Sequence, residues 1–204
     1  MRFRRDILGL RSTRTSLVLA LPASILQSFL PLLSVHGAES ALVLGVILPP
    51  LAALSSARIT KLARESQEPV PLVTLLGSCL GFSLLLFAVP TVVLALGALR
   101  VRNCTPALGL SFMLLGPGMG VLLASVCGML LGLLVPKTRV AAALSLSLPF
   151  IPIVRALAGL YFGPAIFAYG HFFGYFPGTL YDEGVTITAP FLWLRVATAA
   201  WLFG

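Results

Sequence analysis

Six long apolar runs follow one another along the chain, and they constrain its fold more than any other feature. A transmembrane α-helix needs roughly 20 mainly apolar residues to cross about 30 Å of hydrocarbon. The runs cover residues 16–34, 38–56, 70–99, 107–135, 140–162 and 186–204. We therefore predict an all-α fold, a polytopic bundle of six transmembrane helices.

Composition supports a lipid environment. Of the 204 residues, 58% are hydrophobic and only 10% are charged, with a mean hydropathy of +1.04. Soluble domains average roughly 25% charged residues, and a water-soluble fold of this length leaves too much surface exposed to hide so many apolar side chains. We expect a basic cytoplasmic tail over 1–15 and one membrane domain over 16–204, with the bilayer as main partner.

The basic residues predict an orientation. Lys and Arg in short loops favour the cytoplasmic side, and ten of them fall before the first run or in alternate loops, against two in the opposite loops. The ten are Arg2, Arg4, Arg5, Arg11, Arg14, Arg58, Lys61, Arg64, Lys137 and Arg139; the two are Arg100 and Arg102. We expect both termini in the cytoplasm of a bacterial inner-membrane, multi-pass protein. Since these bases form no continuous stripe, the net charge of +8 does not indicate nucleic-acid binding.

Two segments allow a second interpretation. The basic start followed by an apolar run resembles a signal peptide, but the run is long and another follows closely, so we favour an uncleaved span. Residues 58–68 carry Arg58, Lys61 and Arg64 at helical spacing. They predict a topology-fixing cytoplasmic loop, or else a short interfacial helix that contacts a cytoplasmic ATPase.

Small residues recur every four positions through the fourth run, at Gly116, Gly120, Ala124, Gly128 and Gly132. Such a bare row lets a neighbouring backbone approach closely, which predicts a central helix. Gly77 with Gly81 and Gly159 with Gly163 repeat the spacing, so the third and fifth helices are the expected partners. Pro90 and Pro117 are expected kink points, because each removes a backbone donor.

Two arginines lie within apolar runs, where a charge costs about 2.5–3.5 kcal/mol on insertion scales. Arg155 and Arg195 are expected at similar depth near the outer side. Asp182 and Glu183, in the aromatic outer loop 163–185, are the expected counter-charges. The arginines either snorkel or pair structurally, or they hold an anion in an outward-facing pocket closed by the loop.

For that pocket the candidate binding residues are Arg155, Arg195, Asp182, Glu183, Tyr181 and His171. His171 has no second histidine nearby, so no metal site is expected. Zinc-protease, nucleophile-turn and aspartyl-dyad motifs are absent from the sequence. We expect neither an enzyme nor a cofactor.

Residues 173–183 read Phe-Gly-Tyr-Phe-Pro-Gly-Thr-Leu-Tyr-Asp-Glu. This segment resembles one in uncharacterised bacterial multi-span proteins whose membrane region precedes soluble domains. The resemblance implies the membrane part of a longer protein, which the end of the chain within an apolar run also suggests. Two functions remain open. One is an anchoring or scaffold domain that works with a partner or a C-terminal extension, and the other is a permease-like or substrate-capture subunit of a transporter.

Overall fold

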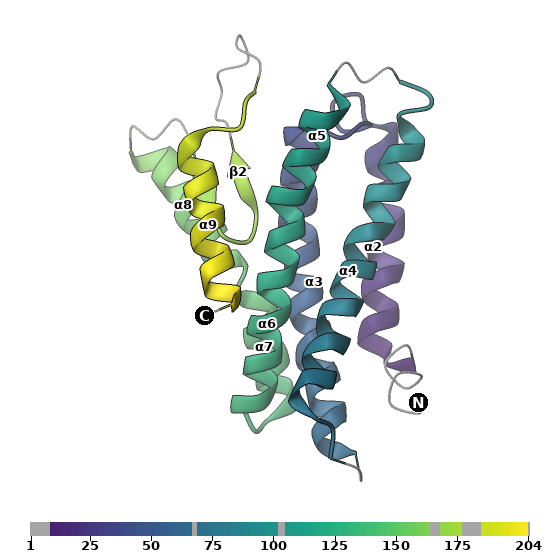
Figure 1. Cartoon of the computed structure of the whole chain (residues 1–204), viewed down its shortest axis with the longest axis vertical. Helices are drawn as coiled ribbons and strands as arrows, with labels where there is room; N and C mark the ends of the chain where they lie inside the picture. The colour runs from purple at the N-terminus through teal and green to yellow at the C-terminus, as the bar shows by residue number, and fades with distance from the viewer. Residues whose placement is uncertain (1–8, 67–68, 102–104, 164–167, 177–184, 204) are drawn as a thin grey trace.

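The structure, a computed structural model, describes residues 9–66, 69–101, 105–163, 168–176 and 185–203. Most of them form helices that run along the long axis of the molecule (Figure 1). In chain order the elements are α2 (Arg11–Phe29), α3 (Ala38–Glu65), α4 (Leu72–Gly97), α5 (Pro106–Met113), the π-helical segment η1 (Leu114–Gly118), α6 (Met119–Leu134), α7 (Thr138–Ser147), α8 (Phe150–Phe162), β1 (Ala168–Gly170), β2 (Gly174–Phe176) and α9 (Ala189–Phe203). The predicted helical bundle is confirmed, with one small β-hairpin added.

Four helical segments in the described part of the chain are long and apolar enough to cross a membrane. They are Ala38–Glu65, Leu72–Gly97, Pro106–Leu134 and Thr138–Gly159. The apolar helix Ala189–Leu202 is shorter, and Ser, Thr and Arg residues lower the hydropathy of α2. Length and composition therefore give four helices that could cross a membrane, whereas the number six stays a prediction.

Helix α2 buries four of its uncharged polar residues and exposes apolar ones. Its buried residues are Thr13, Ser16, Ala20, Ser24 and Gln27, while the side chains of Val18 and Leu26 are each 66% exposed. A helix in water presents the opposite pattern. Lipid tails cover apolar side chains at no cost, and small or hydroxyl residues pack well between membrane helices, so this arrangement fits a bilayer.

Some helix bounds differ from those of the apolar runs. Helix α2 begins at Arg11, within the predicted tail 1–15, and residues 1–8 of that tail lie outside the described part. The fifth run is divided into α7 and α8, with Pro149 at the N-cap of α8, because proline offers no backbone donor to continue the first helix. Pro90 lies inside the single helix α4.

The basic segment after the second run is neither a loop nor a separate interfacial helix, because Arg58, Lys61 and Arg64 belong to the last turns of α3. Lys61 is buried and donates to the carbonyl oxygens of Val135 and Pro136 just after α6. Arg64 Nη1 donates to Leu133 O at 2.8 Å. The last carbonyls of a helix lack intrahelical partners and carry negative partial charge. Lys61 and Arg64 therefore cap the C-terminal end of α6.

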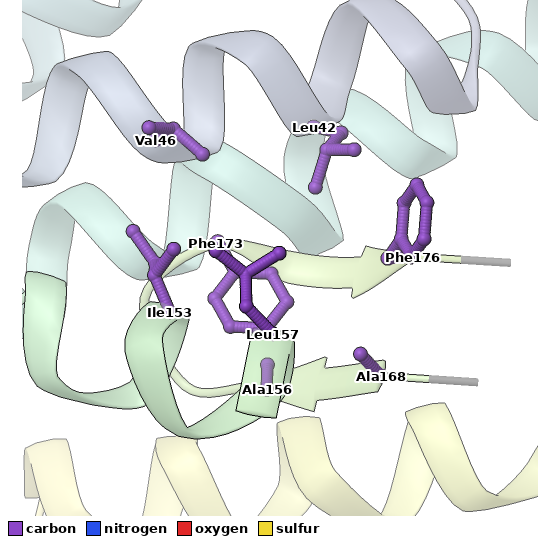
Figure 2. A pocket seen from close by; sticks show the side chains of 8 residues that line it. All are labelled: Leu42, Val46, Ile153, Ala156, Leu157, Ala168, Phe173 and Phe176. Carbon is purple, nitrogen blue, oxygen red and sulfur yellow. The ribbon is translucent and has the colours of Figure 1, made fainter. Parts of the chain in front are cut away.

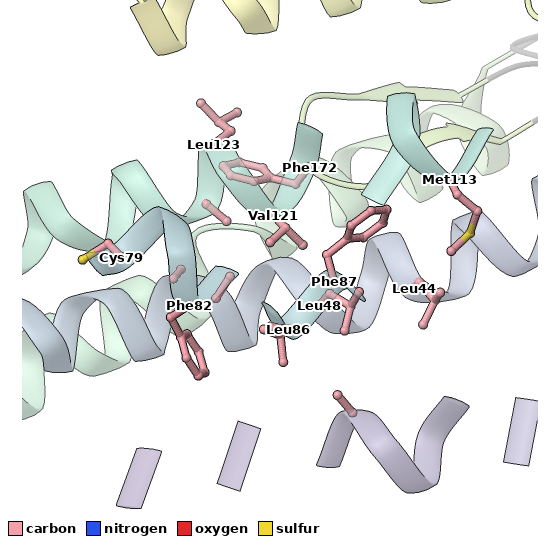
Figure 3. Packing of buried hydrophobic residues seen from close by; sticks show 14 of the residues in the cluster. Leu44, Leu48, Cys79, Phe82, Leu86, Phe87, Met113, Val121, Leu123 and Phe172 are labelled. Atoms are coloured by element: carbon pink, nitrogen blue, oxygen red, sulfur yellow. The ribbon is translucent and has the colours of Figure 1, made fainter. Parts of the chain in front are cut away.

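The core lies where α3, α4 and the α5–η1–α6 helix meet (Figure 3). Leu48, Leu86 and Val121 are fully buried there, one from each helix. Hydroxyl pairs lie beside this apolar core: Ser56 Oγ is 2.8 Å from Ser125 Oγ. The bundle is therefore tightly closed between α3 and α6.

The glycine row does mark a central helix, and its glycines pack mainly against α3, which was not among the predicted partners. The third helix, α4, and the first part of the fifth run, α7, also contact α6, but not through Gly77, Gly81 or Gly159. A Cβ added to Gly128 would overlap the carbonyl oxygen of Ala53, and one added to Gly132 would lie 2.8 Å from Thr60 Cβ. Both neighbours belong to α3. A Cβ on Gly77, Gly81 or Gly159 would meet nothing within 4 Å.

Helix α3 was overlooked as the partner because its small face contains Ala, Ser and Thr instead of glycine. Ala52, Ala53, Ser56, Ala57 and Thr60 are all buried, and together they form a surface nearly as flat as a glycine row. The spacing of small residues therefore identified the central helix correctly, whereas matching glycine pairs did not identify α3 as its neighbour.

Candidate functional site

Between α8 and α9, the described residues 168–176 form a hairpin that enters the bundle. Strands β1 and β2 pair antiparallel, with Ala168 opposite Phe176 and Gly170 opposite Gly174. Figure 1 shows that the hairpin lies between α9 and the α5–α6 helix, with its turn near mid-height of the molecule. Gly174 has φ +96°, a conformation that a residue with a Cβ rarely adopts. The sequence therefore requires glycine at this side of the turn.

Glycines on α3 and α6 leave room for the backbone of the hairpin turn. A Cβ on Gly120 of α6 would overlap the carbonyl oxygen of Phe172, and one on Gly45 of α3 would overlap that of Phe173. The Cα of Gly116 lies 3.0 Å from the Cβ position of Gly174. Gly116 and Gly120, predicted to pack helices, thus contact the hairpin, and Gly120 lies midway along the apolar segment Pro106–Leu134.

Arg195 of α9 holds this turn from the other side. Its side chain is only 3% exposed. Nη1 donates to His171 O at 2.8 Å, and Nη2 lies 3.5 Å from both Gly116 O and Gly170 O. The guanidinium carbon is 5.1 Å from the ring centroid of Phe191. Carbonyl dipoles and an aromatic face stabilise the buried charge where the described residues provide no carboxylate. Among the described residues, Nε has no hydrogen-bond partner.

The π-helical segment η1 positions one of the carbonyl groups that Arg195 contacts, that of Gly116. Pro117 lies within it, and a proline in a helix interior removes a backbone donor, which is a common cause of local π geometry. Gly116 immediately precedes this proline, and its carbonyl oxygen reaches Arg195. Pro117 was expected to kink this helix, and the structure has a π-helical segment at this point.

His171 links the turn to α9 a second time. Its Nδ1 is 2.9 Å from Thr198 Oγ1, and Thr198 Oγ1 donates to Leu194 O at 2.8 Å. A hydroxyl group has a single proton to donate. Since that proton is directed to Leu194, His171 Nδ1 must carry the hydrogen and donate to Thr198. His171 is therefore a hydrogen-bonded structural residue in this state.

Aromatic rings fix the outer part of the hairpin. Tyr175 stacks on Tyr169 with 5.3 Å between ring centroids, and it lies 5.6 Å from Phe191 of α9 and 6.4 Å from Phe112 of α5. Tyr169 Oη is 3.3 Å from Thr188 Oγ1. These contacts join the hairpin to helices on both sides, so it is a packed element of the bundle.

Of the six residues predicted for a paired-arginine pocket, the structure describes Arg155, His171 and Arg195. Arg195 is buried as described, but Arg155 is exposed on α8, so the two side chains lie in different surroundings. Tyr181, Asp182 and Glu183 lie outside the described residues. The described residues contain no group of His, Cys, Asp and Glu that could hold a metal ion.

The prediction missed Gly45, Gly170, Gly174 and Thr198, which all contact the hairpin or hold it. The glycines at positions 170 and 174 flank His-Phe-Phe, and glycine on both sides of a short turn is a recognisable hairpin signal. Gly45 and Thr198 had no such signal, because their role depends on contacts distant in sequence.

An apolar cavity of about 150 Å³ lies beside the hairpin (Figure 2). Its lining comes from α3, α8 and the hairpin: Leu42, Val46, Ile153, Ala156, Leu157, Ala168, Phe173 and Phe176. No polar side chain belongs to this lining, so the cavity offers nothing to orient a charged solute.

Comparisons of the chain with protein-family models, with curated proteins and with solved structures found no significant match. The fold itself defines a class: a helical bundle with four helices apolar enough to cross a membrane, and a hairpin that enters the bundle from one end and is bound by a buried arginine.

Proposed function

We propose that this chain is a membrane-anchoring or scaffold domain, which works with a partner protein or with a C-terminal extension. The observation that carries the proposal is the bonding of Arg195. Its hydrogen bonds go to backbone carbonyls of the chain itself, which is what a charge that stabilises a fixed architecture does. The apolar cavity beside the hairpin supports the same conclusion.

Helix α8 offers the most accessible face for such a partner. None of the side chains described in this helix is buried, and Ile151, Val154 and Leu157 are 60% or more exposed. Among membrane helices, a face of this kind is covered either by lipid or by another helix. The scaffold proposal makes it the partner face, and the partner would be another membrane subunit or the membrane part of an ATPase complex.

Photo-crosslinking in native membranes tests the proposal. A photoreactive residue replaces Val154 on α8 in one variant, and Leu85 in a matched variant. Leu85 is an equally apolar, exposed side chain of α4. The scaffold proposal expects one discrete adduct from position 154 and none from position 85. No adduct from either position, together with migration of the protein as a monomer, would exclude a scaffold role that depends on a partner at α8.

A second candidate is a permease-like or substrate-capture subunit with an outward-facing anion pocket. One observation favours it: Arg195 Nε has no hydrogen-bond partner among the described residues, and hairpins that enter a bundle beside interrupted helices occur at transport sites. Uptake of anions into proteoliposomes, reduced by Arg195→Gln in a variant that still folds, would establish this function in place of the scaffold.

We also propose a cell-membrane location, in a bacterial inner membrane, with the N-terminus in the cytoplasm. The supporting observation is that the start of α2 and the turns after α3 and α6 lie at one end of the molecule (Figure 1). That end carries Arg11, Arg14, Lys61, Arg64 and Lys137, as the positive-inside rule requires of a cytoplasmic face. No enzymatic activity, cofactor or nucleic-acid partner is part of the proposal.

A further inference from the structure

A cavity lies at the basic end of the bundle, far from the hairpin. Its volume is about 450 Å³, and it is formed between the first turns of α2 and a facing stretch of α3. The lining residues are Leu10, Arg11, Ser12, Thr15, Leu54 and Arg58. Unlike the cavity beside the hairpin, this one combines cationic and hydroxyl side chains, so its chemistry suits a small anionic group.

The two arginines have no counter-charge among the described residues. Neither Arg11 nor Arg58 forms an ion pair or a side-chain hydrogen bond with another residue of the described part. Arg11 is exposed and Arg58 is half-buried, and they approach the cavity from different helices. A guanidinium group matches phosphate oxygens with two parallel N–H donors. The two arginine side chains can therefore bind one phosphate from different helices.

A further donor lies in the same place. Ser12 lines the cavity, and its Oγ is buried without a hydrogen-bond partner in the described part of the chain. An unpaired buried hydroxyl is costly, and a bound oxygen would satisfy it.

We propose that this cavity binds the phosphate group of an anionic ligand, with Arg11, Arg58 and Ser12 as the binding side chains. Leu10 and Leu54 add apolar surface to the same cavity, which a lipid would contact with its glycerol and upper acyl carbons. Two sources share this chemistry, the headgroup of an anionic phospholipid and a soluble phosphate.

Thermal unfolding of the full chain in nanodiscs tests the site and distinguishes the sources. In one arm, discs of phosphatidylcholine are compared with discs that also contain phosphatidylglycerol. In the other arm, inorganic phosphate is added to phosphatidylcholine discs, against chloride of equal ionic strength. Arg58→Gln and Arg11→Gln are compared with Arg139→Gln, an exposed arginine at the same end that does not line the cavity.

We expect the melting temperature of the wild-type chain and of Arg139→Gln to rise with one of the probes. The concentration needed for half of this rise should increase about tenfold in Arg58→Gln and Arg11→Gln, since each removes a charge-assisted hydrogen bond. A response to phosphatidylglycerol alone identifies the lipid as source, and a response to inorganic phosphate identifies a soluble ligand.

Two results would overturn the proposal. One is an unchanged melting temperature with both probes, and the other is an equal rise in all variants, which would indicate general charge screening. If Arg58→Gln does not fold, Ser12→Ala and Arg58→Lys replace it. Ser12→Ala removes one donor, and Arg58→Lys keeps the charge but loses the paired donors, so both should weaken the response and leave Arg139→Gln unaffected.

Discussion

At the scale of single residues, Arg195 decides how the hairpin is held. Leaving a charge in a low-dielectric interior costs several kcal/mol unless polar groups surround it. Here the carbonyls of Gly116, Gly170 and His171 provide those groups, and they come from the turn and from the helix facing it. The side chain therefore connects three segments that are distant in sequence.

Replacing Arg195 by Gln should destabilise the protein by about 2–3 kcal/mol, because buried carbonyls lose a charged donor. Arg155→Gln is the matched control. It changes an exposed arginine of α8 and should alter the free energy of unfolding by less than about 0.5 kcal/mol. Chemical unfolding in detergent micelles gives both values. Equal effects of the two substitutions would mean that Arg195 does not stabilise the hairpin.

At the scale of elements, glycine and other small residues set the distances between neighbours. Gly128 brings α6 against Ala53 of α3, and Gly120 admits the hairpin backbone. Helix α6 thus packs against α3 through Gly128 and against the hairpin turn through Gly120. Helix-terminal contacts complete the pair, since Lys61 and Arg64 of α3 bind the last carbonyls of α6.

Gly128→Ala should lower stability by about 1–3 kcal/mol, because its Cβ would overlap backbone that cannot move independently. The melting temperature should fall by several degrees. Gly81→Ala is the control. A Cβ at that position meets nothing within 4 Å, and alanine favours the helix by about 1 kcal/mol. A lower melting temperature for Gly81→Ala than for Gly128→Ala would contradict the assigned packing.

At the scale of the whole molecule, helices alternate in direction and basic residues gather at one end. This end should face the cytoplasm. Reporter fusions test it: a reporter joined after Ser66 should be active in the cytoplasm, and one joined after Leu99 should be active on the opposite side of the membrane. The reverse pattern would invert the orientation, and the same activity at both sites would contradict the crossing of α4.

Much of this architecture could be predicted from the sequence, because lipid solvation depends mainly on local composition. The apolar runs located the helices, and the row from Gly116 to Gly132 located the central one. The contact between Gly120 and Phe172 could not be predicted, since it joins segments about 50 residues apart. The exposure of Arg155 and the burial of Arg195 could not be predicted either, because a sequence gives depth along a helix but not which side faces the interior.

The central claim is that the bundle is closed around the hairpin, with no water path from outside to Arg195. Labelling with a membrane-impermeant thiol reagent in sealed vesicles tests it, using single-cysteine variants in a background where Cys79, Cys104 and Cys127 are replaced by Ser. Thr198→Cys places the thiol beside His171, where Thr198 is fully buried, and Thr186→Cys places it at an exposed position before α9. We predict rapid labelling of Thr186→Cys and none of Thr198→Cys until the protein is unfolded. Equal labelling of both variants in intact vesicles would show that water reaches the arginine and would contradict the account.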